Sequence, residues 1–383
     1  MVGGRGVSKS CRVTTSDAEF TPGLELSRIL YTEAVRPILS QAYPGLPHAA
    51  ALVGTGSEVL GFDTPRSTDH DWGPRLLLFL TPEDVAAHSA DIHRVLAERL
   101  PKEVHGYSTN FQQVNDRVGY IDHTDGPVNH RVVTVEAGSW LTGQLGVDPT
   151  GGELTARDWL AMPQQRLAEV TAGAVFYDSL GTLGAARERL AWYPDQVWRY
   201  LLACQWQRIA QEEAFVGRCA EAGDPLGSAV VAGRLVRDLM RLCLLLGRRY
   251  APYGKWLGSA FQQLPVAGEL SATLRATLAA TGYRERAKHL CEAYEVVAVV
   301  HNESGLTPSL ATTCRRYHGR PYRVLFAERF ANALMETVTD RQLRELPRIG
   351  SVDQWADSTD FLGAQNLRHA VTDALPDAPS QRE

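Results

Sequence analysis

The sequence has no hydrophobic stretch long enough to cross a lipid bilayer. Its longest apolar runs, at 242–246 and 296–300, are flanked by charged or polar residues, whereas a membrane-spanning helix needs about 18 or more consecutive apolar residues. Arg5 and Lys9 near the N-terminus are not followed by the apolar segment of a secretory signal peptide. We therefore expect a cytoplasmic protein with no membrane partner.

The sequence also lacks an excess of positive charge. Its 39 lysines and arginines are outnumbered by 44 aspartates and glutamates, which gives a net charge of -5 at pH 7. A partner such as genomic nucleic acid is therefore not expected, because binding a long phosphate backbone requires a positive field. The six cysteines are far apart and form no CxxC pair, which favours reduced, mostly buried thiols over disulfides or a zinc site.

The composition is that of an ordinary globular protein, with 44% hydrophobic residues in 383, and this length predicts about two domains. No repeat and no low-complexity tract is present, which excludes solenoids and propellers. We expect flexible tails at 1–20 and 371–383, an α/β domain at 21–153 and a helical domain at 154–370.

Short apolar runs indicate strands in the first half and long helical patterns in the second. Strands are expected at 49–53, 75–80 and 130–135, and helices at 24–43 and 82–100. After residue 154 helical periodicity dominates, at 159–176, 197–222, 226–250 and 285–301. The fold class is therefore α/β followed by all-α, with a mixed sheet and a helical bundle.

The segment 53–80, VGTGSEVLGFDTPRSTDHDWGPRLLLFL, carries the most chemical information. Gly54 and Gly56 allow a sharp turn after a strand, where Ser57 and backbone amides can donate to a phosphate oxygen. Asp69 follows Ser57 by twelve residues, and Asp71 by fourteen. On an extended backbone their carboxylates would share one face and could bind hard cations.

This order and spacing resemble the signature of the polymerase-beta-type nucleotidyltransferase superfamily. The resemblance implies that Gly56 and Ser57 hold the terminal phosphates of a nucleoside triphosphate and that Asp69 and Asp71 bind two Mg²⁺ ions. The strings GSEVLGFD and STDHDWGPR, together with YAPYGKW at 250–256, are also similar to an uncharacterised bacterial family of that superfamily. This likeness extends from about Phe20 to beyond Phe261 and brings no known substrate.

The superfamily resemblance also implies a third carboxylate on a neighbouring strand. We place it at Glu136, at the end of the strand 130–135, with Asp63 and Asp122 as alternatives. The Gly73-Pro74 pair directly after the two aspartates departs from the smooth strand that is usual in the superfamily. It leaves the register of this strand open.

A nucleotidyltransferase-like domain followed by a helical domain is an arrangement that resembles the aminoglycoside nucleotidyltransferases. In those enzymes the acceptor binds between the domains, and the helical domain supplies a glutamate base and a phosphate-binding lysine. Glu212 or Glu213 and Lys255 would take these parts here, although each also has a simple structural use on a helix.

Two further features allow more than one interpretation. His70 and Asp71 could form the metal-binding dyad of an HD-type phosphohydrolase, but Gly73-Pro74 argues against the helix that such a site needs. A row of arginines on a helical segment could meet phosphates or form a solvated face. Its members are Arg234, Arg237, Arg241, Arg248 and Arg249.

The function that the sequence favours is Mg²⁺-dependent transfer of a nucleoside monophosphate, with ATP as the expected donor, to a hydroxyl of a small molecule. Modification of a protein or tRNA, as in toxin and antitoxin pairs, is the alternative within the same chemistry. A nucleotide-binding regulator with a degenerate site is the alternative outside catalysis. The sequence does not identify the acceptor.

Overall fold

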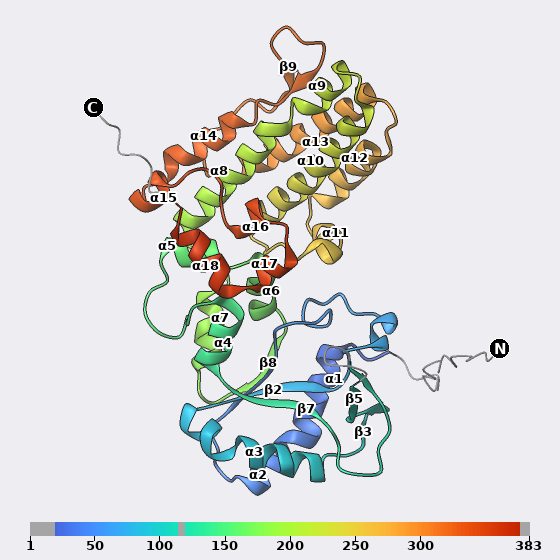
Figure 1. Cartoon of the computed structure of the whole chain (residues 1–383), viewed down its shortest axis with the longest axis vertical. Coiled ribbons are helices and arrows are strands. Elements are labelled where there is room, and N and C mark those ends of the chain that lie inside the picture. Colours follow the sequence, from blue (N-terminus) through green and yellow to red (C-terminus); the bar gives the residue numbers. More distant parts are fainter. Residues whose placement is uncertain (1–19, 114–118, 376–383) are drawn as a thin grey trace, which may run out of the picture.

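The computed structural model describes residues 20–113 and 119–375, which form two lobes joined by several segments (Figure 1). The expected tail at 1–20 lies outside this range except for Phe20, as do residues 376–383. A sheet with its covering helices forms one lobe, and a bundle of helices forms the other. The predicted fold class, α/β followed by all-α, is confirmed.

The sheet has four strands in the order β7-β2-β1-β8. Strand β1 is antiparallel to both β2 and β8, while β2 and β7 are parallel. The strands are β1 (Ala49–Leu52), β2 (Arg75–Leu80), β7 (Arg131–Glu136) and β8 (Ala174–Asp178). Two-stranded ribbons are formed by β3 (Glu103–Val104) with β4 (Tyr107–Ser108), β5 (Phe111–Gln113) with β6 (Gly119–Ile121), and β9 (Arg315–Arg316) with β10 (Arg323–Val324).

Alternating side chains bury both faces of the sheet. Leu76, Leu78 and Leu80 of β2 pack in one cluster with residues of α1 (Gly23–Ile29), the π-helix η1 (Leu30–Val35), α2 (Arg36–Ala42) and α3 (Pro82–Arg99). Phe79 of the same strand points to the other face, where it joins residues of α4 (Ala137–Leu145) and α7 (Thr182–Arg189). The period of two follows from the strand pleat, and the three predicted strands are confirmed.

The fourth strand, β8, is the main difference from the sequence expectation. A helix was expected over 159–176, but the chain forms α5 (Ala156–Ala161) and α6 (Gln164–Thr171) and then returns to the sheet. Gly173 makes this return possible, because its φ is +68° and a Cβ atom there would overlap the carbonyl oxygen of Leu52. The predicted domain boundary at 153/154 is therefore wrong, since β8 pairs with β1.

The remaining helices build the second lobe. They are α8 (Asp195–Glu212), α9 (Phe215–Glu221), α10 (Pro225–Leu246), α11 (Gly254–Gln262), α12 (Ala267–Ala279), α13 (Tyr283–Glu303), α14 (Glu328–Thr337), α15 (Arg341–Glu345), α16 (Val352–Trp355), α17 (Thr359–Gly363) and α18 (Gln365–Asp373). The last helix ends at Asp373, so the predicted start of the tail at 371 is wrong. In α18 the buried Arg368 donates to the carbonyl oxygen of Ala161, the last residue of α5. This hydrogen bond joins the last helix of the chain to α5.

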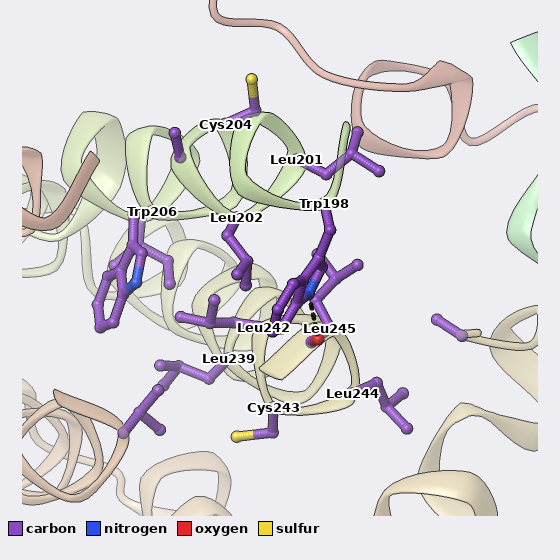
Figure 2. Packing of buried hydrophobic residues seen from close by; sticks show 14 of the residues in the cluster. Trp198, Leu201, Leu202, Cys204, Trp206, Leu239, Leu242, Cys243, Leu244 and Leu245 are labelled. Carbon is purple, nitrogen blue, oxygen red and sulfur yellow. Dashed lines mark hydrogen bonds between the residues drawn. The ribbon is translucent and has the colours of Figure 1, made fainter. Parts of the chain in front are cut away.

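The core of the helical lobe forms between α8 and α10, whose apolar faces meet (Figure 2). Trp206 stacks on Phe330 of α14 with ring centroids 4.5 Å apart, and its indole donates to His301. Trp198 donates to the carbonyl oxygen of Leu245 at 2.8 Å. The two indole N–H groups are thus satisfied inside an otherwise apolar core.

Within the described residues, no helix is long and apolar enough to span a membrane. The five described cysteines are free, and three of them are buried, as expected: Cys204, Cys243 and Cys314. Cys11 lies outside the described residues.

Two leucines on α10 test the importance of this core. Leu242 is fully buried, whereas Leu226 is 74% exposed. We expect Leu242→Ala to lower the free energy of unfolding by about 2–5 kcal/mol, because it removes packed methyl groups and leaves a cavity. Leu226→Ala on the same helix should change it by less than about 0.5 kcal/mol. Equal effects in urea unfolding would contradict the packing described here.

Candidate active site

A pocket of about 230 Å³ lies where the sheet lobe meets the helical lobe. We call it the site pocket. Residues from the loop between β1 and β2, from α6 and from the start of α11 line it: Thr55, Gly56, Ser57, Glu58, Leu60, Ser67, Asp69, His70, Asp71, Trp72, Gln165, Glu169, Tyr253, Lys255 and Trp256. The structure thus brings together five predicted residues: Gly56, Ser57, Asp69, Asp71 and Lys255.

The turn at Gly56 closes over a buried ion pair. Glu58 is 3% exposed, and its Oε1 lies 2.8 Å from Nε of Arg75, at the start of β2. The Arg75 guanidinium also donates to the carbonyl oxygen of Thr55. Gly56 has φ of +150°, and a Cβ atom there would overlap Nη2 of Arg75 and lie 2.7 Å from Oε2 of Glu58. Only glycine fits this close approach.

The two aspartates do not lie on an extended strand, as the sequence suggested. Asp69 ends a short 3₁₀ helix, η2 (Pro65–Asp69), and β2 begins only at Arg75. Asp71 has a left-handed backbone with φ of +49°. Its N–H donates to the carbonyl oxygen of Gly119, and its Oδ1 accepts from the N–H of Gly119 at 3.0 Å. Both carboxylates nevertheless line the site pocket.

An arginine, not an acid, lies beside Asp71 on the neighbouring strand. Arg131 begins β7 and pairs in register with Arg75. Its Nη2 lies 3.0 Å from Oδ1 of Asp71, and its guanidinium stacks on the ring of Phe111 at 4.4 Å. Arg131 does not itself line the site pocket, but it is paired with the lining carboxylate of Asp71.

Glu136 is not the third carboxylate of this site. In the parallel register it pairs with Leu80, at the opposite end of β2 from the aspartates. Its carboxylate caps α4 by accepting from the N–H groups of Gly138 and Ser139 at 2.7 and 2.6 Å. These bonds lower its pKa, although partial burial opposes them.

Neither of the two alternative acids lines the site pocket. Asp63 accepts from the N–H of Gly23 and from the Trp72 indole, and exposed Asp122 accepts from the N–H of His123. Over the described residues, 20–113 and 119–375, no group of three acidic, histidine or cysteine side chains could hold a metal ion. The described part of the chain therefore supplies no third metal-binding side chain beside the aspartate pair.

Lys255 reaches the site pocket from the helical lobe. Its Nζ lies over the ring of Trp256 at 4.8 Å, and Trp256 stacks on Phe62 of the sheet lobe with centroids 5.2 Å apart. The start of α11 is held by the N–H of Tyr253, which donates to Oε1 of Gln165 on α6 at 2.8 Å. These contacts hold an ammonium group in the same pocket as the Gly56-Ser57 turn.

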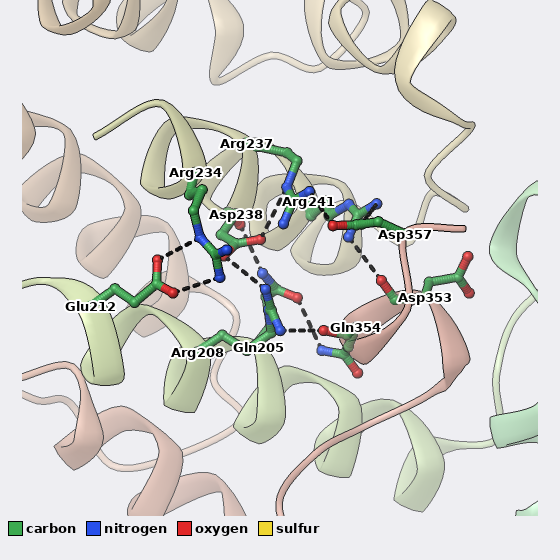
Figure 3. A network of polar contacts seen from close by, with 10 residues as sticks. All are labelled: Gln205, Arg208, Glu212, Arg234, Arg237, Asp238, Arg241, Asp353, Gln354 and Asp357. Carbon is green, nitrogen blue, oxygen red and sulfur yellow. Dashed lines mark hydrogen bonds and ion pairs between the residues drawn. The ribbon is translucent and has the colours of Figure 1, made fainter. Parts of the chain in front are cut away.

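Glu212 and Glu213 do not line the site pocket, contrary to the sequence prediction. Helix α8 carries them to the end of the helical lobe near β9 (Figure 1). Glu212 pairs with Arg234 at 2.6 Å, within a polar network between α8, α10 and the C-terminal segment (Figure 3). Glu213 is 8% exposed and accepts from the N–H groups of Leu325, Phe326 and Ala327.

Sequence reasoning missed several polar residues of the pocket. Glu169 is buried, with one carboxylate oxygen accepting from Gln165 and the other paired with Arg166 at 2.7 Å. Glu58 also lines the pocket and is buried, and it pairs with the partly exposed Arg75 behind it. A glutamate directly after the Gly-Ser turn and an arginine opening the next strand were visible signals. Nothing in the local sequence marked Glu169.

Comparison with known proteins gives a family match over part of the chain. Residues 159–257 match a family model described as "Domain of unknown function (DUF4037)". No curated protein matches the sequence. Among solved structures, the chain is similar to a nucleotidyltransferase-like protein from Exiguobacterium sibiricum 255-15, with 13% identity, a TM-score of 0.31, and coverage of 71% of this chain and 76% of that chain.

The closeness of the turn to the ion pair can be tested at Gly56. A methyl group there would displace the end of the Arg75 side chain and strain the backbone at φ of +150°. We expect Gly56→Ala to lower the free energy of unfolding by about 1–3 kcal/mol, the usual cost of such a backbone conformation for a residue with a side chain. The control is Gly258→Ala on α11, where a Cβ atom would meet nothing within 4 Å. Unchanged stability of Gly56→Ala in chemical denaturation would show that the turn is not so confined.

Burial of Glu213 makes a second prediction possible. Desolvation raises the pKa of this carboxyl from 4.5 to about 7, while three backbone N–H donors act in the opposite direction. Because the folded state then holds the proton more tightly than the unfolded state, Glu213 reduces stability as pH rises from about 4.5 to about 7. Relative to Glu213→Gln, the wild type should lose up to about 3 kcal/mol over this interval. A difference in unfolding free energy that does not change with pH would contradict this.

Proposed function

We propose that this protein transfers a nucleoside monophosphate from a nucleoside triphosphate, with ATP as the expected donor, to a hydroxyl of a small molecule, releasing pyrophosphate. The observation that carries the proposal is the meeting of the Gly56-Ser57 turn, the aspartate pair and Lys255 in one pocket between two lobes. A glycine-serine turn and an ammonium group suit phosphates, and paired carboxylates suit hard cations.

The aspartate pair would hold one Mg²⁺ ion in this proposal. Mg²⁺ is bound in proteins through one or two carboxylates, together with waters and substrate phosphates. Oδ1 of Asp71 is engaged by Arg131 and Gly119, which leaves its second oxygen for a cation. Such an ion would neutralise charge on the reacting phosphates. The second ion that the sequence led us to expect has no third carboxylate among the described residues.

The chain's own residues would divide the remaining tasks between the two lobes. Ser57 would donate to a phosphate oxygen, and Lys255 would offset the charge of the departing pyrophosphate. The acceptor oxygen forms a bond to the α-phosphorus while the bond to pyrophosphate breaks, and the hydroxyl proton goes to a base. Glu169, in place of Glu212 or Glu213, is the pocket acid from the helical lobe, and we assign it this role.

A specific observation also favours a second candidate, a nucleotide-binding regulator that does not catalyse transfer. Arg131 pairs with Asp71 on the strand where the superfamily resemblance implies a third acid. A site that has a cation where a metal-binding carboxylate is expected could still bind a triphosphate, because the triphosphate is negatively charged. The two candidates differ in one product, pyrophosphate.

The test is pyrophosphate release from each of the four nucleoside triphosphates with Mg²⁺ and a panel of hydroxylated small molecules. We expect Asp69→Asn and Asp71→Asn to reduce the rate by at least about a hundredfold, because each removes charge that would bind the cation. The matched control is Asp122→Asn, an exposed acid outside the site pocket, which should retain the wild-type rate.

Binding can be followed separately through the fluorescence of Trp72 and Trp256, which line the site pocket. Triphosphate binding without pyrophosphate release from any acceptor would favour the regulator. Absence of triphosphate binding would contradict both candidates.

A further inference from the structure

A second cavity, of about 320 Å³, lies beside the site pocket. We call it the basic pocket. It is lined by Leu60, Phe62, Ala168, Thr171, Ala172, Arg187, Ala191, Leu244, Arg248, Arg249, Tyr250, Pro252, Ala260 and Gln263. Three of these residues are arginines and none is acidic. The volume is within the range of small-molecule sites.

The basic pocket and the site pocket share a wall. Leu60 lines both cavities. Phe62 of the basic pocket stacks on Trp256 of the site pocket, and Pro252 and Tyr253 face one cavity each. A molecule in the basic pocket would therefore be separated from the site pocket by this wall of Leu60, Phe62 and Trp256.

The arginine row of the sequence separates into two groups. Arg234, Arg237 and Arg241, on the body of α10, are held by Glu212, Asp357 and the Asp353 carbonyl oxygen (Figure 3). Arg248 and Arg249 follow the end of α10, and neither has a carboxylate within ion-pair distance in the described part of the chain. The guanidinium of Arg248 lies instead over the ring of Trp198 at 4.3 Å.

Arg187 adds a fixed cation to the same wall. Its guanidinium donates to the carbonyl oxygens of Val170, Thr171 and Ala172, at 3.1, 2.8 and 2.9 Å. These acceptors are neutral, so the charge of Arg187 is not cancelled. Burial lowers its pKa, as expected for a cation without an anionic partner. Three cations around one cavity would repel a cationic molecule and attract an anionic one.

The rest of the wall is largely apolar. Leu60, Phe62, Leu244, Pro252 and Ala260 supply hydrophobic surface, with the ring of Tyr250 beside them. A small hydrophilic anion would leave this surface in contact with water. The wall is instead suited to a molecule with an apolar or aromatic body and a carboxylate, sulfonate or phosphate group.

We propose that the basic pocket binds the acceptor and that the acceptor is an anion with an apolar body. This inference rests on the proposed function and narrows it. It separates this protein from the aminoglycoside nucleotidyltransferases, to which the order of domains expected from the sequence is similar, because a polycationic aminoglycoside would face three arginines and no acid.

A matched pair of fluorescent probes tests the pocket without requiring turnover. 8-Anilinonaphthalene-1-sulfonate and N-phenyl-1-naphthylamine share an aromatic body, and only the first carries a sulfonate. We expect the Arg248→Gln/Arg249→Gln protein to bind the sulfonate about fivefold more weakly, as two partly exposed ionic contacts would predict, and to bind the neutral probe as the wild type does. Arg275→Gln, an exposed arginine on α12 outside the pocket, should alter neither affinity.

Three outcomes of this experiment would overturn the inference. They are unchanged sulfonate binding in the double variant, an equal loss for both probes, or competitive displacement of the sulfonate by ATP, which would assign the pocket to the nucleotide. If loss of the Arg248 contact with Trp198 impairs folding, Arg249→Gln alone provides the same comparison, with about a twofold loss expected.

Turnover distinguishes the inference from the proposed function. With an anionic aromatic alcohol as acceptor, Arg249→Gln should raise the KM for the acceptor about twofold and leave the KM for ATP unchanged. Pyrophosphate release with cationic acceptors alone would overturn the anionic acceptor while the transferase stands. Arginine-dependent sulfonate binding without pyrophosphate release from any acceptor would overturn the transferase, while the pocket's preference for anions stands.

Discussion

Hydrogen bonds to a single short helix, α6, hold the two sides of the site pocket together. The carbonyl oxygen of Glu169 accepts from Gly54 in the sheet lobe at 2.8 Å, and Gln165 accepts from Tyr253 in the helical lobe at 2.8 Å. One turn of α6 thus fixes both the glycine-serine turn and the helix that carries Lys255. Because the donors are backbone N–H groups, the geometry depends on chain position more than on the identity of the donor residues.

This dependence explains which parts of the site were predictable from the sequence. Strands β1 and β2 are antiparallel neighbours, so the end of β1 and the start of β2 lie next to each other and both ends of the connecting loop are close together. Ser57 and Asp71 lie on that one loop, and local spacing was sufficient to place them together. The strands themselves were recognisable from short apolar runs that end at glycine or proline.

Glu136 was misplaced because its position depends on strand direction, which local sequence does not encode. Because β7 is parallel to β2, Arg131 lies beside the start of β2 and Glu136 lies beside its other end. The prediction that Glu212 or Glu213 lies in the site was wrong for a similar reason. They follow almost five turns of α8, and only the tertiary direction of that helix decides which end approaches the sheet. Strand β8 was missed because a single glycine, Gly173, ends the helical pattern.

The charges of the two neighbouring pockets are opposite in sign, and α6 with its adjoining loops lies between them. Four acids line the site pocket: Glu58, Asp69, Asp71 and Glu169. Only arginines supply charge to the basic pocket. Glu58 is paired with Arg75, Glu169 with Arg166 and Asp71 with Arg131, so Asp69 is the lining carboxylate without an arginine partner in the described part of the chain. A metal ion bound there and an anion bound in the basic pocket would each reduce a local excess of charge.

Arg131 affects how many metal ions the proposed reaction would need. Its guanidinium is fixed between Asp71 and the ring of Phe111, so it would not have to reorganise when negative charge develops on a phosphate. A permanent cation at the edge of the sheet can provide some of the charge neutralisation that a second metal ion would otherwise supply. The described part of the site has no group of three metal-binding side chains, and the proposed transfer would therefore use a single ion, bound through Asp69 and the second oxygen of Asp71.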